Sequence, residues 1–274
     1  MKIIYKFDKL IISEVVNRPS KKIKSPYLAD VLINKKEELA HSPGLGLCGF
    51  ITTGSTVALS STSPESNRKS KYTVELVKVS NDDNKVVWVG ANPATSNLYF
   101  NNIIEKNLLT FIPKIEIIKR EVKLPDYESR FDFFLETKSG KKFIVEIKNV
   151  PLVDYPKDKM PSFRKFPERK CGKRNAIFPD GYQSKKGDCV SPRALKHLKE
   201  LMQIKKKNPE LNPMLIFVVQ REDCYGFSPN FEKDPLYSNE LKKAYQSGLT
   251  IKVIMLKMSP KNIKFVKEIP IVFN

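Results

Sequence analysis

The chain has 274 residues, 41% of them hydrophobic, which is enough to bury a sizeable core as one large domain or two small ones. Lysine and arginine number 49 against 30 acidic residues, and the net charge of +19 favours a polyanionic partner, first of all nucleic acid. A lysine-rich surface without such a partner is the alternative. The four cysteines lack paired spacing and only two histidines accompany them, so a zinc cluster is disfavoured.

The same composition bears on where the protein works. Cysteines without a pairing pattern are typical of reduced thiols, which predicts an intracellular protein, cytoplasmic or, in a eukaryote, nuclear. Residues 1–8 contain no long apolar run followed by a small-residue cleavage site, and no later segment reaches about 18 uninterrupted apolar residues. Neither secretion nor a membrane partner is therefore expected, and the oligomeric state stays open.

Residues 1–90 predict a small β-rich domain. Apolar and polar residues alternate over 72–76, a turn follows at 81–84, and the chain returns through an apolar run at 86–89. Short strands joined by long polar loops, such as 60–70, indicate a compact barrel. Gly44, Gly46 and Gly49 have the spacing of a dinucleotide-binding fingerprint, but they lie among short β runs and open no clear helix, so we reject that interpretation.

Residues 91–274 alternate between helix and strand patterns, which predicts an α/β domain. Helices are expected over 97–109 and 191–208, the second beginning with a capping serine and a proline. Apolar runs at 214–219 and 249–256 are typical of strands buried on both faces, in a mostly parallel sheet with crossover helices. Residues 154–187 are rich in lysine, arginine and proline without periodicity, which indicates a mobile loop.

Two strands between residues 130 and 150 carry the candidate chemistry. Because side chains alternate along a strand, Glu146 and Lys148 share one face, and a turn centred on Ser139 places Asp132 opposite Glu146. Their Cβ atoms would then lie about 5 Å apart, where two carboxylates repel unless a cation bridges them. Oxygen ligands suit Mg²⁺ or Mn²⁺, and Lys148 could orient the attacking water or stabilise charge on a phosphate. The alternative is an edge hairpin whose charges face solvent.

Several short segments resemble, in order, the signature blocks of the sugar fermentation stimulation protein A (SfsA) family. They are residues 72–77, 120–123, 129–132, 145–150, 178–180, 196–201 and 217–221. The resemblance implies an N-terminal OB-like barrel over residues 1–90 and a PD-(D/E)xK nuclease-like α/β domain with a mixed central sheet over residues 91–274. In that signature Asp132 and Glu146 match the metal-binding carboxylates and Lys148 the lysine, and Glu121 matches an additional acidic position. Gln220 is a further candidate, or else a strand-end glutamine satisfied by the backbone.

The chain departs from the family pattern in two places. Where the family usually resembles H-x-P-N-T-G-S-M, this chain begins with His41 and continues with serine, proline and a glycine-leucine run, so the Asn and Thr are missing. The segment over 155–187 also contains a basic insertion, which is either a phosphate-contacting arm or a solvated loop. The candidate nucleic-acid contacts are Arg130, Lys165, Arg169, Lys173, Arg174, Arg193 and Lys196.

The sequence leaves two functions open. The first is a magnesium-dependent nuclease that acts on nucleic acid, DNA in the first instance, with little sequence specificity. The second is a non-catalytic DNA-binding regulatory protein. Tyr72 and Trp88 could stack on bases from the barrel or could belong to its core, and His197 is ambiguous because it lies beside the apolar stripe of its helix.

Overall fold

The N-terminal part of the chain folds into a closed barrel in a computed structural model, which describes residues 1–47, 49–62, 68–170, 172–179 and 189–273. The strands β2, β3, β4, β5 and β6 pair as neighbours, and a short parallel pairing of Ala40 with Tyr72 joins β4 to β6 and closes the ring. Alternate residues fill the interior, so that Val15, Val57 and Val74 are fully buried. The bounds are β2 Ile11–Asn17, β3 Leu28–Ile33, β4 Lys36–His41, β5 Thr56–Ser61, β6 Tyr72–Ser80 and β7 Val86–Gly90.

The second part is built on a sheet with the strand order β1-β15-β14-β12-β10-β9-β8. The central strands β10, β12 and β14 are parallel, whereas the pairs on either side of them are antiparallel. The sheet is therefore mixed, and the expectation of a mostly parallel sheet was wrong because hairpins extend it on both sides. The bounds are β8 Ile115–Lys123, β9 Arg130–Thr137, β10 Lys142–Val150, β12 Met214–Val219, β14 Thr250–Lys257 and β15 Asn262–Glu268.

The first strand of the chain belongs to this sheet and not to the barrel. Strand β1 (Lys2–Lys6) pairs antiparallel with β15, so that Lys2 lies beside Phe265. The barrel is thus inserted between the first strand of the sheet and all the others. This arrangement differs from the expected division at residue 90, since no local pattern in a five-residue strand reveals a partner so distant in sequence.

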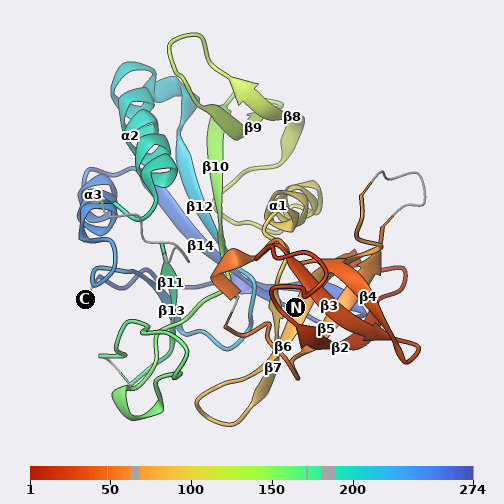
Figure 1. The fold of residues 1–274 in the computed structure, drawn as a ribbon. Helices are drawn as coiled ribbons and strands as arrows, with labels where there is room; N and C mark the ends of the chain where they lie inside the picture. The colour runs from red at the N-terminus through yellow and green to blue at the C-terminus, as the bar shows by residue number, and fades with distance from the viewer. Residues whose placement is uncertain (48, 63–67, 171, 180–188, 274) are drawn as a thin grey trace.

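Helices cover the two faces of the sheet (Figure 1). Helix α1 (Thr95–Glu105) packs on one face through Tyr99 and Phe100, together with an outer wall of the barrel that includes Leu76 and the partly buried Trp88. Helices α2 (Pro192–Lys207) and α3 (Pro235–Gln246) pack on the other face. Strand β10 contributes to both faces, and its even-numbered residues face α2 and α3. None of the helices in the described residues is long and apolar enough to cross a membrane.

The basic segment after β10 is packed against the rest of the protein over its described part. Tyr155 and Phe166 are buried, and their rings lie 5.0 Å apart between centroids. Strand β11 (Asn175–Phe178) pairs with β13 (Gly226–Pro229), and short 3-10 turns cover Lys157–Lys159 and Pro209–Leu211. The mobile loop expected over residues 154–187 is therefore wrong for residues 154–170 and 172–179, while residues 180–187, including Asp180, lie outside the described residues.

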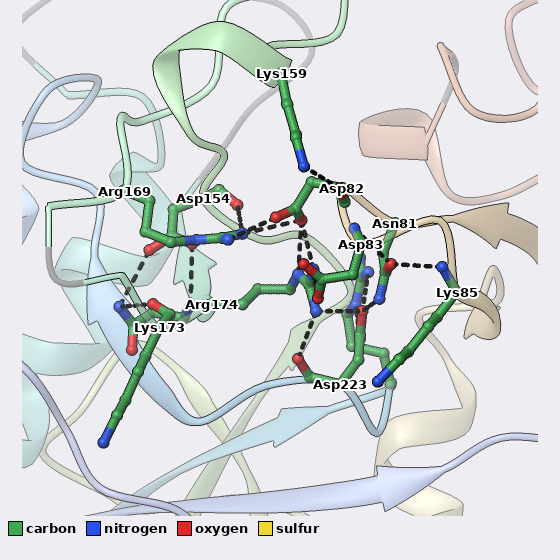
Figure 2. Close-up of polar contacts among 12 residues, drawn as sticks. Asn81, Asp82, Asp83, Lys85, Asp154, Lys159, Arg169, Lys173, Arg174 and Asp223 are labelled. Atoms are coloured by element: carbon green, nitrogen blue, oxygen red, sulfur yellow. Dashed lines mark hydrogen bonds and ion pairs between the residues drawn. The ribbon is translucent and has the colours of Figure 1, made fainter.

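A buried cluster of ion pairs joins this segment to the barrel (Figure 2). Asp82, in the turn between β6 and β7, accepts hydrogen bonds from Arg169 at 2.6 and 3.0 Å and from Arg174 at 2.5 and 2.9 Å. Arg169 also donates to Asp154, and Arg174 lies 3.2 Å from a carboxylate oxygen of Asp223. These contacts fix the barrel against the α/β domain. Cys189 and Cys224 are free thiols, and Cys48 and Cys171 lie outside the described residues.

Candidate active site

The β9–β10 hairpin carries two carboxylates close enough for the charge of Glu146 to raise the pKa of Asp132. The ladder runs from Lys142 beside Glu136 to Val145 beside Phe133 and ends one step before Glu146 and Asp132. One carboxylate oxygen of Asp132 accepts a hydrogen bond from the backbone N–H of Ile147, and the other accepts one from the Asn97 side chain, both at 2.7 Å. Asp132 is therefore held by its own hairpin and by the first turn of α1.

Glu146 is buried on the face of the sheet that α2 covers. Its Oε1 atom accepts a hydrogen bond from Lys148 Nζ at 2.6 Å and also contacts Nδ1 of His197. Among the described residues, its Oε2 atom is buried and has no hydrogen-bond partner. A buried carboxylate oxygen without a partner is costly, so a cation or a hydrogen-bond donor at this atom would be favourable.

The electrostatics of the two carboxylates differ. Burial raises the pKa of Asp132 to about 6, and the negative charge of Glu146 adds to the rise, while hydrogen bonds from Ile147 and Asn97 oppose it. Burial would also raise the pKa of Glu146, but the hydrogen bond from His197 and the positive charge of Lys148 lower it overall. Glu146 is consequently ionised at neutral pH, and because a carboxylate only accepts, Nδ1 of His197 donates to it.

The other catalytic candidates from the sequence, Gln220 and Glu121, lie outside this contact network. Gln220 is buried just after β12, and its side chain donates to Ser96 Oγ at 2.8 Å. Gly90 packs directly against it, since a Cβ atom there would lie 1.7 Å from the Gln220 side-chain oxygen. Glu121 is exposed on β8 with a φ of 51°. Within the described residues, its side chain is not among the hydrogen-bond partners of Asp132 or Glu146.

The basic residues proposed to contact nucleic acid fall into two groups. Arg169 and Arg174 are committed to the buried ion pairs with Asp82, which leaves them little access to a phosphate. The others reach the surface, although Lys173 lies over the Tyr225 ring and Lys196 pairs with Glu128. The exposed residues of the set are Arg130, Lys165, Lys173, Arg193 and Lys196.

Sequence reasoning left His197 without a role and missed Asn97, the two residues whose side chains contact the carboxylates from the helices. His197 is on the buried side of α2 beside Leu198 and Leu201, and Asn97 is in the first turn of α1. The sequence offered one signal, a histidine on the helix face that carries the core residues. That signal fits a functional histidine and equally a buried histidine whose hydrogen bonds are only structural. The partner of each residue lies on a strand far away in sequence.

The donor set suits a hard divalent cation. Within the described parts of the chain, no group of three or more His, Cys, Asp and Glu side chains is arranged to hold a metal ion. The site instead offers two carboxylates, one of which has an unpartnered buried oxygen. Ions that keep several water ligands, such as Mg²⁺, bind proteins through one or two carboxylates, so the residues present fit such an ion.

Comparisons with known proteins agree with the fold. The family model described as "Sugar fermentation stimulation protein RE domain" matches residues 94–262. A sugar fermentation stimulation protein homolog of Prochlorococcus marinus (strain MIT 9312) is 34% identical over 255 residues, which cover 90% of this chain and 89% of the relative. This chain belongs to the SfsA family.

Further SfsA relatives extend the comparison. The homolog of Bdellovibrio bacteriovorus is 30% identical over 252 residues, covering 87% of this chain and 88% of that protein. A solved structure described as that of Pyrococcus furiosus SfsA in complex with Ca²⁺ superposes with a TM-score of 0.74, at 21% identity, over 99% of this chain and 100% of the other. The expected fold, an OB-like barrel followed by an α/β domain, is confirmed.

Proposed function

We propose that this protein binds nucleic acid, DNA in the first instance, and hydrolyses its phosphodiester bonds with a divalent metal ion, Mg²⁺ or Mn²⁺. The observation that carries the proposal is that Glu146 and Lys148 both act electrostatically on Asp132, while the buried Oε2 atom of Glu146 has no partner among the described residues. This trio matches the signature of PD-(D/E)xK nucleases in residue type and order. That Pyrococcus furiosus SfsA was solved in complex with Ca²⁺ supports a divalent ion in this family.

Each residue of the trio has a role that follows from its contacts. Asp132 and Glu146 would hold the cation, which when bound supplies Lewis-acid stabilisation of the charge that develops on the phosphate. Lys148 would orient the attacking water or stabilise the same charge through its ammonium group. The net charge of +19 would attract the phosphate backbone without reading its sequence.

A non-catalytic DNA-binding role is the second candidate. Lys148 forms an ion pair with Glu146, and His197 donates to the same oxygen, so Glu146 has partners without a metal. The chain also lacks the Asn and Thr of the usual N-terminal block near His41. Both observations are compatible with a protein that keeps the nuclease fold and has lost the reaction.

Cleavage assays on the full chain separate the two functions. Labelled single- and double-stranded DNA and RNA would be incubated with Mg²⁺ or Mn²⁺, with the double variant Asp132→Asn, Glu146→Gln as the control. We expect hydrolysis that requires the metal and disappears in the double variant, together with binding that weakens steeply with salt. Salt-dependent binding without hydrolysis of any substrate would establish the second function instead, and binding that ignores salt would exclude a phosphate-dominated interface.

A further inference from the structure

His197 has no role in the trio described above, yet it contacts the buried carboxylate of Glu146 directly. Its ring is 4% exposed, and its Nδ1 atom lies against Glu146 Oε1. The side chain comes from α2, a layer separate from the hairpin that carries Glu146. We infer that His197 is a positioning residue that fixes Glu146 Oε1 and leaves Oε2 for the divalent cation, an inference that rests on the proposed metal site.

The distribution of donors around Glu146 supports this assignment. Oε1 receives both His197 and Lys148, whereas Oε2, although buried, has no partner among the described residues. A carboxylate free to rotate would share its donors between the two oxygens, because leaving one buried oxygen unpaired costs free energy. The imidazole held in the α2 layer would oppose that rotation and keep Oε2 available for a cation.

A second polar atom without a partner lies in the same electrostatic environment. The Tyr237 side chain on α3 is fully buried, and among the described residues its hydroxyl has no hydrogen-bond partner. Burial raises the pKa of Tyr237 well above its ordinary value, and the charge of Glu146 raises it further. Among the described residues, the interior between the sheet and helices α2 and α3 therefore contains two buried polar atoms without hydrogen-bond partners, Glu146 Oε2 and the Tyr237 hydroxyl.

The two carboxylates are held in comparable ways from opposite layers. Asn97 of α1 donates to Asp132 at 2.7 Å, and His197 of α2 donates to Glu146. Hydrogen-bonding partners of metal-ligating side chains set the orientation of the ligand, and removing one such partner commonly weakens metal affinity about 10- to 100-fold. We expect the loss of the His197 hydrogen bond to weaken metal affinity by a factor within this range.

Calorimetric titration of the full chain with Mn²⁺ tests the role directly. His197→Leu removes the donor while keeping a residue that a buried helix face accepts, and His197→Asn places an amide N–H near the position of Nδ1. We expect the leucine variant to bind Mn²⁺ about 10- to 100-fold more weakly and the asparagine variant to recover most of the loss. Lys199→Ala, an exposed change on the same helix, should leave the affinity unchanged.

Nuclear magnetic resonance provides a readout that needs neither activity nor a hydrophobic substitution. The chain has only two histidines, so the ring signals of His41 and His197 can be distinguished. Addition of Mg²⁺, and separately the change Glu146→Gln, should shift the His197 signal and leave that of His41 in place. This measurement also decides the matter if His197→Leu fails to fold.

The outcomes separate this inference from the function on which it rests. Metal binding by the unmodified protein, with equal affinity in the leucine and asparagine variants and an unmoved His197 signal, would overturn the positioning role and leave the nuclease proposal intact. Equal weakening in both variants would make His197 a packing residue. Absence of metal binding in the unmodified protein would overturn both the positioning role of His197 and the metal-dependent nuclease proposal.

Discussion

At the scale of single residues, the site combines two shielded carboxylates with one ammonium group. The Lys148 side chain is 13% exposed, so its ammonium is largely enclosed, and it lies 2.6 Å from Glu146. Most other lysines of the chain sit on the surface and contribute to a diffuse positive field. Lys148 therefore acts mainly on the neighbouring carboxylates, whereas a surface lysine contributes mainly to the overall positive field of the protein.

Replacing the Lys148 ammonium group should lower the cleavage rate more than the affinity for nucleic acid. Lys148→Ala is expected to lower the single-turnover cleavage rate about a hundredfold, equivalent to about 3 kcal/mol, because a preorganised charge is lost at the reacting phosphate. Affinity in a filter-binding assay should hardly change, since 48 other basic residues remain of the 49. Lys138→Ala, an exposed change in the turn of the same hairpin, is the control and should alter neither quantity. Equal losses of rate and affinity in Lys148→Ala would make it a phosphate anchor.

The sequence was sufficient to predict the hairpin part of the site but not its surroundings. Period-two alternation and the turn near Ser139 placed Asp132, Glu146 and Lys148 on one face, and the observed register follows that turn as far as the pair Val145 and Phe133. The shared face of the carboxylates stays a prediction, since Asp132 contacts Asn97 of α1 whereas Glu146 contacts His197 of α2. The partners of the carboxylates could not be predicted in the same way. Asn97 lies 35 residues from Asp132 and His197 lies 51 residues from Glu146, so their contacts depend on how the helices pack on the sheet.

At the scale of elements, the basic segment after β10 shows where composition misleads. Its lysines, arginines and prolines are typical of a loose loop, but its aromatic residues determine how it packs. The Phe166 ring lies 5.8 Å from that of Phe50, which belongs to the barrel part of the chain, and 5.0 Å from that of Tyr155. Strands with strong local patterns, β10 and β12 among them, were predicted well because their signal lies within a few residues.

Truncating an aromatic residue in this segment should therefore cost folding stability. Phe166 is 1% exposed, so Phe166→Ala is expected to lower the free energy of unfolding by about 3 to 5 kcal/mol, through lost burial and a remaining cavity. Its neighbour Phe163 is 47% exposed, and Phe163→Ala should have a much smaller effect. Urea unfolding followed by circular dichroism measures both. Two variants as stable as the unmodified protein would mean that the segment does not pack in solution.

At the scale of the whole molecule, the ion-pair cluster connects the two domains and should make their stability depend on pH. Burial would raise the pKa of Asp82, but hydrogen bonds from Arg169 and Arg174 lower it strongly. In the same cluster, Arg221 outweighs burial and lowers the pKa of Asp223 to about 2. Burial raises the pKa of Asp154, which acts in the opposite direction. A carboxylate with a lowered pKa stabilises the folded state above its ordinary pKa of about 4, and this stabilisation is lost as the pH falls towards the lowered value.

Removing the charge of Asp82 should flatten this dependence. At pH 6, Asp82→Asn is expected to lower the free energy of unfolding by about 3 to 5 kcal/mol, because buried guanidinium groups lose their partner. Between about pH 4 and pH 2 the variant should lose less stability than the unmodified protein, since it has one fewer carboxylate to protonate. Asp83→Asn is the matched control, because that side chain is 55% exposed although it also pairs with Arg174. Equal pH profiles for all three proteins would contradict the assigned role of the cluster.

The pairing of β1 with β15 also determines how the barrel is tethered. The chain enters the barrel through residues 7–10, after β1, and leaves it through residues 91–94, before α1. The Asn102 side chain of α1 donates to the backbone oxygen of Ile4 at 2.9 Å, so the two anchoring elements are attached to each other. Two covalent tethers fixed side by side would permit rotation about the axis that they define. The turn containing Asp82 adds an attachment away from that axis, as does the packing of Phe50 on Phe166, so rotation of the barrel about the two tethers would have to break the buried ion pairs.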